Sequence, residues 1–527
     1  MAKPNKSKFQ TEINEIPLLD RIVFYFTVSI TGAAVMMIEL MGTRIIGPFF
    51  GVSLVVWSSL LSVALLALAL GYFWGGRFAD RIAWLRLSHI ILAAAVWIGA
   101  IPWLSEPVQL MMNSLGLRLG ALGSAFVLFT FPLFMLGMVG PYVIKIATRR
   151  LDVIGSTVGN VYAMSTLGSV VGTLLLGFYL LPLAGVELIV LSLSGTLIGL
   201  SLLLFLYESK YLPQIESIPL KASVAFFVLA LATLFASVLK PEKKYLGYEV
   251  LFDKEGRYGW VRVVDKKDEN LRYLLADAST IGAESLITRQ PMLSYQEIVK
   301  LVTAFNREGK DLLLVGLGSG HLVTSLAEEG IRSDAIEIDP LVVEAAENFF
   351  NYQPTGDTIV GDARYQIKKI KKKYDFIVHD CFTGGAEPVH LLSREMISEL
   401  KGMLKPGGIL AINFVGFNKK QKDNPVQSVA YTIDQEFKHR KSYVSVPNAE
   451  WNDFIFFASD TALELSHSTK QDAMAQTTLR KHEIYINGYG GRLITDDYNP
   501  METMQIAKAE YYREILVDRL GQDILFR

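Results

Sequence analysis

The chain has 527 residues, a formal net charge of −1 and 51% hydrophobic residues. Its mean hydropathy of +0.32 is too high for a wholly soluble protein, and the near-zero charge argues against nucleic acid as a partner. The single cysteine, Cys381, excludes an intramolecular disulfide. Because the sequence contains no CxxC or HExxH spacing, we expect no bound metal.

Seven apolar stretches, each close to the ~20 residues that cross a bilayer, occupy the first part of the chain. They cover approximately residues 22–43, 55–75, 88–104, 121–146, 156–182, 186–207 and 221–239. The first stretch is longer than a signal-peptide core and lacks a small-residue cleavage site. We therefore expect residues 1–240 to form a transmembrane helical domain of about seven spans, multi-pass in the cell (inner) membrane.

A different pattern begins after residue 240. Between Tyr248 and Ile281, apolar and polar residues alternate with period two, and turn signals separate the pieces. This pattern predicts a small antiparallel β subdomain over residues 241–290. Residues 291–527 alternate buried strands with helical patterns, which predicts an α/β Rossmann-like domain of the methyltransferase type.

The strand expected at Leu312–Val315 is followed by a glycine-rich turn. Gly316, Gly318 and Gly320 let the backbone approach a ligand closely and direct free N–H groups at it. Glu337, near the end of the next strand, is placed to accept hydrogen bonds from ribose hydroxyls. Together these residues predict a nucleoside-binding crevice.

Two further acidic residues follow the next two strands. Asp362 stands before Ala363 at the end of a short strand, and Asp380 ends the strand Tyr374–His379. The carboxyl ends of parallel strands line one crevice, so we expect both carboxylates to converge with Glu337. Capping of the following helix is the alternative for each residue alone. Three acidic residues beside one glycine turn favour the binding site.

The segments GLGSG, EID, GDA and KPGG, with the strand ending in Asp380, resemble the spermidine synthase family of aminopropyltransferases. The β unit and the helix start at Ser294–Glu297 fit the same family, so the likeness covers about residues 248–415. More closely, the chain resembles the membrane-fused branch of that family. Thr495–Glu502 is similar to a TDDYxPxE signature of the branch.

The resemblance implies decarboxylated S-adenosylmethionine as the co-substrate. Glu337 would then contact the ribose, and Asp362, with Ala363 beside it, would contact the adenine amine. The glycine turn would lie along the same molecule. No metal is implied.

The resemblance also implies an acceptor half of the site. Asp380 would lie near the reacting amine, where a carboxylate can hold the amine and accept its proton. Tyr295 and Gln296 would line the amine channel. His390 could contact substrate or act as a base, the alternative being a solvated loop histidine. Asp497 could supply negative charge to the crevice, the alternative being a turn residue.

The chain also departs from the family pattern. Soluble members carry an acidic residue inside the glycine loop, which would bind the amine of decarboxylated S-adenosylmethionine, and this chain has Ser319 there. The acidic pair before the Tyr-Gln helix is replaced by Met292 and Leu293. Asp496, Asp497 and Glu502 could restore the lost charge if their loop folds over the crevice, and capping or turn roles are the equal alternative.

We therefore expect a membrane-anchored enzyme of polyamine biosynthesis that transfers an aminopropyl group to a polyamine or other small amine. Two alternatives stay open. One uses S-adenosylmethionine as a methyl donor, since Ser319 would not repel its carboxylate. The other is a non-catalytic nucleoside or polyamine sensor that regulates transport by the membrane helices. The expected partners are the amine and the lipid bilayer, and a homo-oligomer is left open.

The charge distribution and the origin of the co-substrate indicate opposite sides of the membrane for residues 241–527. Basic residues gather at the amino terminus, between Arg77 and Arg86, and between Lys145 and Arg150. The positive-inside rule then places the amino terminus in the cytoplasm, and seven spans would place the carboxy-terminal domain outside. Nucleoside co-substrates are made in the cytosol. We expect the cytoplasmic side, which requires one re-entrant stretch.

Overall fold

The computed structural model describes residues 18–51, 54–81, 85–148, 154–211, 219–241, 243, 245–382, 385–418, 424–465 and 469–525. The amino-terminal lysines and Arg149–Arg150, on which the topology argument partly rests, lie outside the described residues. The chain divides into two compact units, one of Met1–Ile46 with Val55–Glu242 and one of Gly47–Leu54 with Lys243–Arg527.

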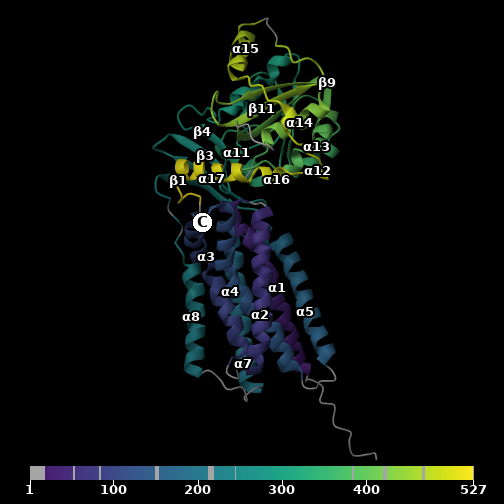
Figure 1. The fold of residues 1–527 in the computed structure, drawn as a ribbon. Helices are drawn as coiled ribbons and strands as arrows, with labels where there is room; N and C mark the ends of the chain where they lie inside the picture. Colours follow the sequence, from purple (N-terminus) through teal and green to yellow (C-terminus); the bar gives the residue numbers. More distant parts are fainter. Residues whose placement is uncertain are drawn as a thin grey trace, which may run out of the picture. The chain divides into compact units, whose positions relative to one another are not determined.

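The first unit is helical (Figure 1). Its long helices are α1 (Leu18–Phe50), α2 (Leu54–Arg81), α3 (Leu87–Asn113), α4 (Gly116–Ala147), α5 (Ile154–Leu175), α7 (Val186–Tyr211) and α8 (Leu220–Val238). A π-helical turn, η2 (Leu176–Leu180), and the short α6 (Leu181–Leu183) continue α5. Among the described residues, seven helices are long and apolar enough to cross a membrane, judged by length and composition. The predicted fold class of this part of the chain is confirmed.

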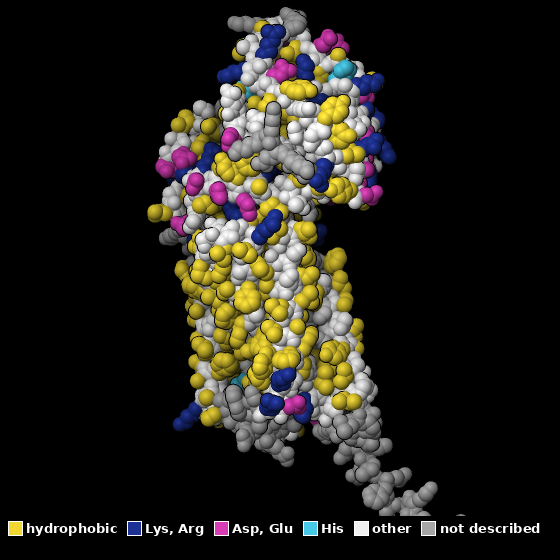
Figure 2. Space-filling model, viewed as in Figure 1, with side chains coloured by type: hydrophobic (Ala, Val, Ile, Leu, Met, Phe, Trp, Pro, Cys, Tyr) yellow, Lys and Arg dark blue, Asp and Glu magenta, His cyan; other side chains and the backbone are white. Residues whose placement is uncertain are grey.

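Large hydrophobic side chains cover the outer surface of this helical unit (Figure 2). Phe73, Phe178, Leu183 and Phe235 are among those with more than half of their surface exposed. Monomers in water rarely expose apolar patches of such extent. A lipid environment would remove that cost, because the lipid tails are as apolar as these side chains.

Small residues bring two of these helices into close contact. A Cβ atom added to Gly168 of α5 would lie 2.0 Å from the backbone oxygen of Ser29 in α1. One added to Gly172 would lie 2.7 Å from the Cβ of Ala33. The glycine spacing therefore serves helix packing, as such spacings do in membrane bundles.

The second unit begins with a four-stranded antiparallel sheet in the order β1-β2-β3-β4. Its strands are β1 (Tyr248–Glu255), β2 (Trp260–Lys266), β3 (Leu271–Ala276) and β4 (Ser279–Ser285). Asn270 and Asp277 adopt positive φ values of 55° and 51° in the two turns that flank β3, a conformation that Asn and Asp tolerate better than most residues.

The larger sheet has seven strands in the order β10-β11-β9-β8-β5-β6-β7. They are β5 (Asp311–Val315), β6 (Arg332–Glu337), β7 (Thr358–Val360), β8 (Tyr374–His379), β9 (Leu404–Phe417), β10 (His439–Val444) and β11 (Trp451–Ser459). Strands β5 to β9 pair in parallel, and β11 pairs antiparallel to both β9 and β10. This arrangement confirms the predicted α/β sheet domain of the methyltransferase type.

Helices cover both faces of this sheet (Figure 1). The cluster with residues from α12 (Ala363–Lys369), α13 (Arg394–Gly402) and α14 (Pro425–Glu436) packs on one face. The other face takes residues from α9 (Tyr295–Val299), η3 (Lys300–Phe305), α10 (His321–Ala327), α11 (Pro340–Phe349) and α15 (Lys470–His482). Leu313 and Leu314 of β5 belong to opposite clusters, so the continuous apolar run of this strand reflects burial on both sides.

The chain ends in the helices α16 (Met501–Met504) and α17 (Ile506–Leu520), which a buried ion pair anchors to the sheet unit. Lys508 of α17 donates to Oε2 of Glu387, and each side chain is 1% exposed. The other oxygen of Glu387 accepts from the backbone N–H of Val415 in β9 at 2.8 Å. Glu387 therefore connects α17 directly to the sheet.

We expect Lys508→Met to lower the free energy of unfolding by about 3–5 kcal/mol, because it leaves the Glu387 carboxylate buried without its cation. Thermal unfolding of the full chain in detergent would show this as a lower Tm. Lys254→Met is the matched control, because the exposed pair of Lys254 and Glu344 contributes at most about 1 kcal/mol. Equal changes in Tm for the two variants would contradict the anchoring role.

Candidate functional site

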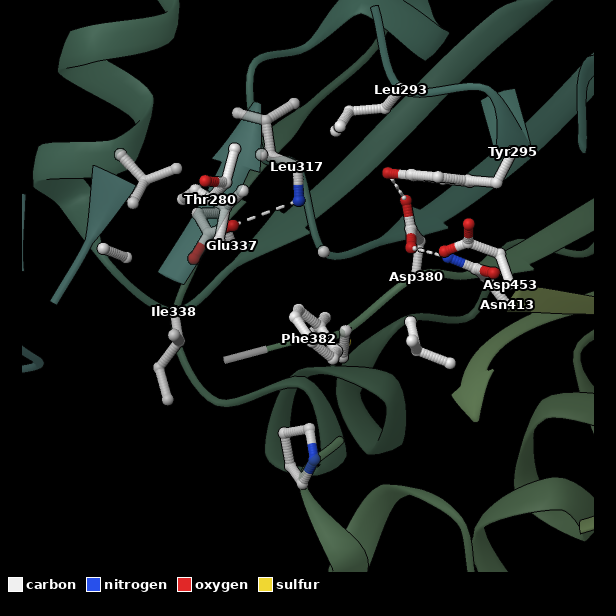
Figure 3. A pocket seen from close by; sticks show the side chains of 18 of the residues that line it. Thr280, Leu293, Tyr295, Leu317, Glu337, Ile338, Asp380, Phe382, Asn413 and Asp453 are labelled. Atoms are coloured by element: carbon white, nitrogen blue, oxygen red, sulfur yellow. Dashed lines mark hydrogen bonds between the residues drawn. The ribbon is translucent and has the colours of Figure 1, made fainter. Parts of the chain in front are cut away.

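A cavity of about 550 Å³ lies at the carboxyl ends of the parallel strands. Glu337 ends β6, Asp362 follows β7 and Asp380 follows β8, and all three line this one cavity. Figure 3 shows Glu337 and Asp380 on either side of the segment that carries Leu317. The cavity therefore has two halves, one at Glu337 and one at Asp380.

The glycine turn brings the backbone to the edge of the cavity. Gly316 has a φ of +95°, and a Cβ atom there would lie 2.1 Å from the backbone oxygen of Asp380. Gly318 has a φ of +54°, and its Cβ would lie 2.6 Å from the backbone oxygen of Ile281. Both glycines line the cavity, whereas Gly320 is the N-cap of α10 and is not among the lining residues.

Glu337 is held by two backbone donors. Its Oε2 accepts from the N–H of Leu317 at 3.0 Å, and its Oε1 accepts from the N–H of Asp339 at 3.0 Å. Burial raises the pKa of this carboxyl, and the backbone donors act in the opposite direction. Each carboxylate oxygen can accept a further bond. Glu337 is thus fixed beside the glycine turn with capacity left for ligand hydroxyls.

Asp380 is held by side chains from two other elements. Its Oδ2 accepts from the Tyr295 hydroxyl of α9 at 2.8 Å, and its Oδ1 accepts from Nδ2 of Asn413 in β9 at 3.0 Å (Figure 3). Burial raises the pKa of Asp380, and the donors from Asn413 and Tyr295 lower it. Gln296 is buried, donates weakly to the Tyr295 hydroxyl at 3.5 Å, and leaves its own Oε1 without a partner.

Asp362 combines the two roles that the sequence left open. Its side chain caps α12 by accepting from the N–H of Tyr365 at 2.9 Å, and it also lines the cavity. Ala363 and His390 line the cavity beside it. Nε2 of His390 lies 3.7 Å from Asp362, and about half of each side chain is exposed. This edge of the cavity is therefore open and polar.

The loop near the carboxyl terminus does not bring Asp496 or Asp497 to the cavity. Asp496 forms an ion pair with Arg364, in which Nη1 and Oδ1 are 2.7 Å apart. Asp497 is exposed and is not among the lining residues, because its loop lies at the protein surface. The side chain of Glu502 lies outside the described residues. For Asp497, the geometry fits the turn interpretation and not the site.

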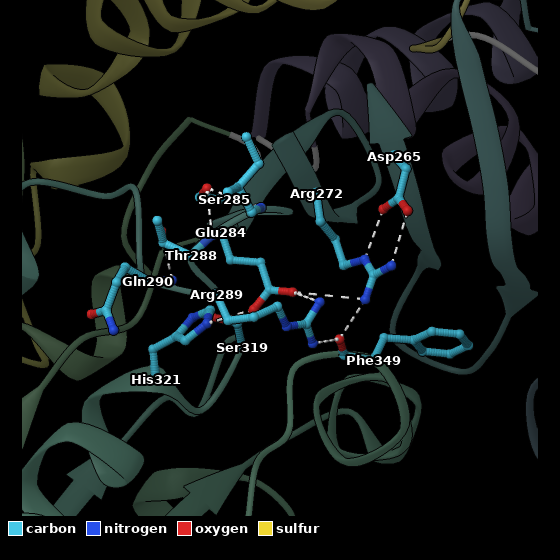
Figure 4. A network of polar contacts seen from close by, with 11 residues as sticks. Asp265, Arg272, Glu284, Ser285, Thr288, Arg289, Gln290, Ser319, His321 and Phe349 are labelled. Atoms are coloured by element: carbon cyan, nitrogen blue, oxygen red, sulfur yellow. Dashed lines mark hydrogen bonds and ion pairs between the residues drawn. The ribbon is translucent and has the colours of Figure 1, made fainter. Parts of the chain in front are cut away.

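Ser319 is 2% exposed and is not among the lining residues. Its Oγ lies 2.7 Å from Nδ1 of His321, whose Nε2 lies 3.0 Å from Oε2 of Glu284. Glu284 also pairs with Arg289 and with Arg272, the latter at 3.7 Å (Figure 4). This network joins β4 to the glycine turn, and the negative charge of Glu284 in it is balanced by arginine side chains.

Several lining residues are not predicted from the sequence. Asp453 and Trp451 come from β11, and Tyr512 and Arg519 come from α17. A lone acidic residue inside the otherwise apolar strand WNDFIFFAS was the available signal for Asp453. No comparable signal marks α17, because only packing brings this helix to the cavity.

Carboxylates predominate among the charged residues of the lining. Its carboxylates are Glu337, Asp339, Asp362, Asp380 and Asp453. Among the described residues of the lining, Arg519 is the one lysine or arginine. Such a charge balance favours ligands that carry positive charge. Across the described part of the chain, no group of three or more His, Cys, Asp and Glu side chains is placed to hold a metal ion.

Comparison with known proteins places these features in a family. The model of the spermine/spermidine synthase domain matches residues 292–467. The chain is 32% identical to the polyamine aminopropyltransferase of Vibrio vulnificus over 222 residues, 38% of this chain and 72% of that protein. It is also 32% identical to the N-terminal histidine N-methyltransferase of Emericella nidulans over 193 residues, 32% of this chain and 34% of that protein.

The chain thus spans about a third of the fungal methyltransferase. Among solved structures, a probable spermidine synthase from Corynebacterium glutamicum has a TM-score of 0.41 and 15% identity, over 47% of this chain and 97% of that chain. The sheet and the cavity at its carboxyl edge define a fold of the methyltransferase type. Within that class, the chain belongs to the spermidine synthase-like family, whose members named here are transferases.

The ionisation of Asp453 should make the stability of the folded protein depend on pH. The pKa of its carboxyl is raised from 3.8 to about 6, mainly by burial and also by the nearby charges of Asp380 and Glu387, against the hydrogen bond from Ser445. Because the folded-state pKa is raised, the stabilisation present below pH 3.8 is lost as the pH rises through about 6. At pH 8 the loss is on the order of 3 kcal/mol.

Asp453→Asn removes this ionisation. We therefore expect the variant to have a higher Tm than the natural protein at pH 8 and an equal Tm near pH 4. Thermal unfolding of both proteins across this pH range measures the difference. A Tm difference that does not depend on pH would contradict a buried, ionising Asp453.

Proposed function

We propose that the protein is an aminopropyltransferase that uses decarboxylated S-adenosylmethionine to alkylate a small amine. The observation that supports it best is the single acidic cavity into which three successive strand ends bring Glu337, Asp362 and Asp380. A sulfonium donor with a free ammonium group and an amine acceptor are both cations, and they suit a lining with one cationic side chain.

Different residues of the cavity would bind the donor and accept the proton of the amine. Glu337, beside the glycine turn, would hold the ribose, and Asp362 with Ala363 would lie at the adenine. The acceptor nitrogen would attack the methylene carbon next to sulfur, and the carbon–sulfur bond would break with its electron pair retained by sulfur. The proton released from nitrogen would pass to Asp380. Tyr295 and Asn413 hold Asp380 in place, so positioning is achieved before the amine binds.

The proposal includes a membrane location. The apolar helices of the first unit would anchor the enzyme in the bilayer, and the cell membrane is the location proposed. The donor is made in the cytosol, which supports a cytoplasmic site. The acceptor would be a polyamine or another small amine.

The test is product analysis with the full chain in detergent or nanodiscs. We expect mass spectrometry to detect an aminopropylated amine and methylthioadenosine when decarboxylated S-adenosylmethionine and a panel of amines are supplied. Asp380→Asn should keep donor binding and lower the transfer rate by about 10²–10⁴-fold, because the proton acceptor is lost. Asp460→Asn, at an exposed residue paired with Lys401, is the control and should retain the rate. Equal rates for Asp380→Asn and the natural protein would reject the assigned base.

A second candidate, methyl transfer from S-adenosylmethionine, is favoured by one observation. Arg519 of α17 is among the residues that line the cavity, and its guanidinium lies 5.7 Å from the centre of the Tyr273 ring. A guanidinium pairs well with a carboxylate, and S-adenosylmethionine carries the carboxylate that its decarboxylated form lacks. The relatives include a histidine N-methyltransferase as well as aminopropyltransferases.

The two donors can be separated with Arg519→Met. If the guanidinium binds the donor carboxylate, this variant should weaken S-adenosylmethionine binding by about 10- to 100-fold and leave the decarboxylated form unaffected. Calorimetry with both donors measures the affinities. Arg332→Met, at the exposed start of β6, is the control. Preference of the natural protein for the carboxylated donor, abolished in Arg519→Met, would replace aminopropyl transfer by methyl transfer.

A further inference from the structure

The acceptor half of the cavity contains a second carboxylate, Asp453, to which no role has yet been assigned. Asp453 lines the cavity and belongs to β11, where it lies opposite Val415 of β9. Val415 is two residues beyond Asn413, so both point to the same face of the sheet. Asp380 follows His379, which pairs with Ile412, and therefore stands beside Asn413 on the same face.

Asp380, Asn413 and Asp453 thus form a row across three neighbouring strands (Figure 3). Strands are about 4.8 Å apart, so the backbones of Asp380 and Asp453, two strands apart, are separated by roughly 10 Å or slightly more. Their side chains both reach the cavity from these positions. The row therefore extends away from the reacting centre and ends in a second negative charge.

Among the described residues, no cation is bonded to Asp453. One of its oxygens accepts from the Ser445 hydroxyl at 2.8 Å. Within the described residues, no lysine or arginine forms an ion pair with Asp453 or with Asp380, and the nearby Lys508 is bonded to Glu387. A buried carboxylate without a partner cation is costly. A ligand that brings a positive charge would remove this cost.

The surroundings of Asp453 also suit an alkylammonium ion. Trp451 lies two residues earlier on the same strand face, and its ring stacks on that of Tyr512 with centroids 6.4 Å apart. Aromatic walls accommodate methylene chains and attract cations. Oδ1 of Asn413 and Oε1 of Gln296 are buried acceptors without a hydrogen-bond partner among the described residues, and both residues line the cavity. Ammonium groups supply the donors that these oxygens lack.

We propose that Asp453 binds a second ammonium group of the acceptor, distal to the amine that reacts at Asp380. Asp453 is then the residue that selects a diamine or longer polyamine over a monoamine. This inference rests on the proposed function and adds to it the residue that determines acceptor specificity.

The test compares a diamine with a monoamine of the same carbon chain, butane-1,4-diamine and butan-1-amine, on the full chain. For Asp453→Asn we expect kcat/KM for the diamine to fall by about 10- to 100-fold, mainly through KM, because a charged hydrogen bond is lost. The value for the monoamine should stay within about twofold. Asp453→Glu should restore part of the preference, and Asp460→Asn should leave both values unchanged.

Other outcomes would overturn the inference. If kcat/KM falls equally for both amines in Asp453→Asn, Asp453 has a structural role and does not select the diamine. If kcat/KM falls for neither amine, Asp453 does not contribute to acceptor binding. If the natural protein transfers no group to any amine, the proposed function fails, and equilibrium binding of the two amines then decides the inference separately. Diamine binding that weakens in Asp453→Asn while monoamine binding is unchanged would still support it, and equal affinities would reject it.

Discussion

The parallel pairing of β5 with β6 on one side and β8 on the other is the constraint on which the site depends. Val315 of β5 pairs with Ile336 and with His379, so the following residues of all three strands emerge at one edge. The backbone N–H of Gly316 bonds to Ile336 and that of Asp380 bonds to Val315, at 2.9 and 2.8 Å. These bonds fix the glycine turn between two carboxylates. A side chain at Gly316 would collide with Asp380, so the close approach of the strand ends requires glycine there.

The buried carboxylates at this edge of the sheet are stabilised by different hydrogen-bond donors and cations, and these differences indicate their functions. Glu337 receives two backbone donors, and Asp380 receives a phenol and an amide. Glu387 has the full charge of Lys508 and is a structural anchor. Asp453 has one hydroxyl donor, from Ser445, and no cation bonded to it within the described residues. The least compensated charges therefore face the cavity, which is the arrangement expected of a site for cationic ligands.

The proposed acceptor half is assembled from distant parts of the chain. Ser319 of the glycine turn belongs to a buried network with His321 and Glu284. β11 supplies a carboxylate in another place, and α17 adds Tyr512 and Arg519. α17 lies after residues 292–467, the segment that matches the family domain.

The sequence by itself determined the fold class, the run of seven apolar helices and the convergence of Glu337, Asp362 and Asp380 on one crevice. Strand ends and glycine turns are local patterns, and parallel pairing makes their spatial consequence predictable. Tertiary structure alone decided that Asp453 and α17 reach the cavity, that Asp497 stays at the surface and that Ser319 turns away. These placements depend on register between distant strands and on helix packing, and neither is encoded in the spacing of residues along the chain.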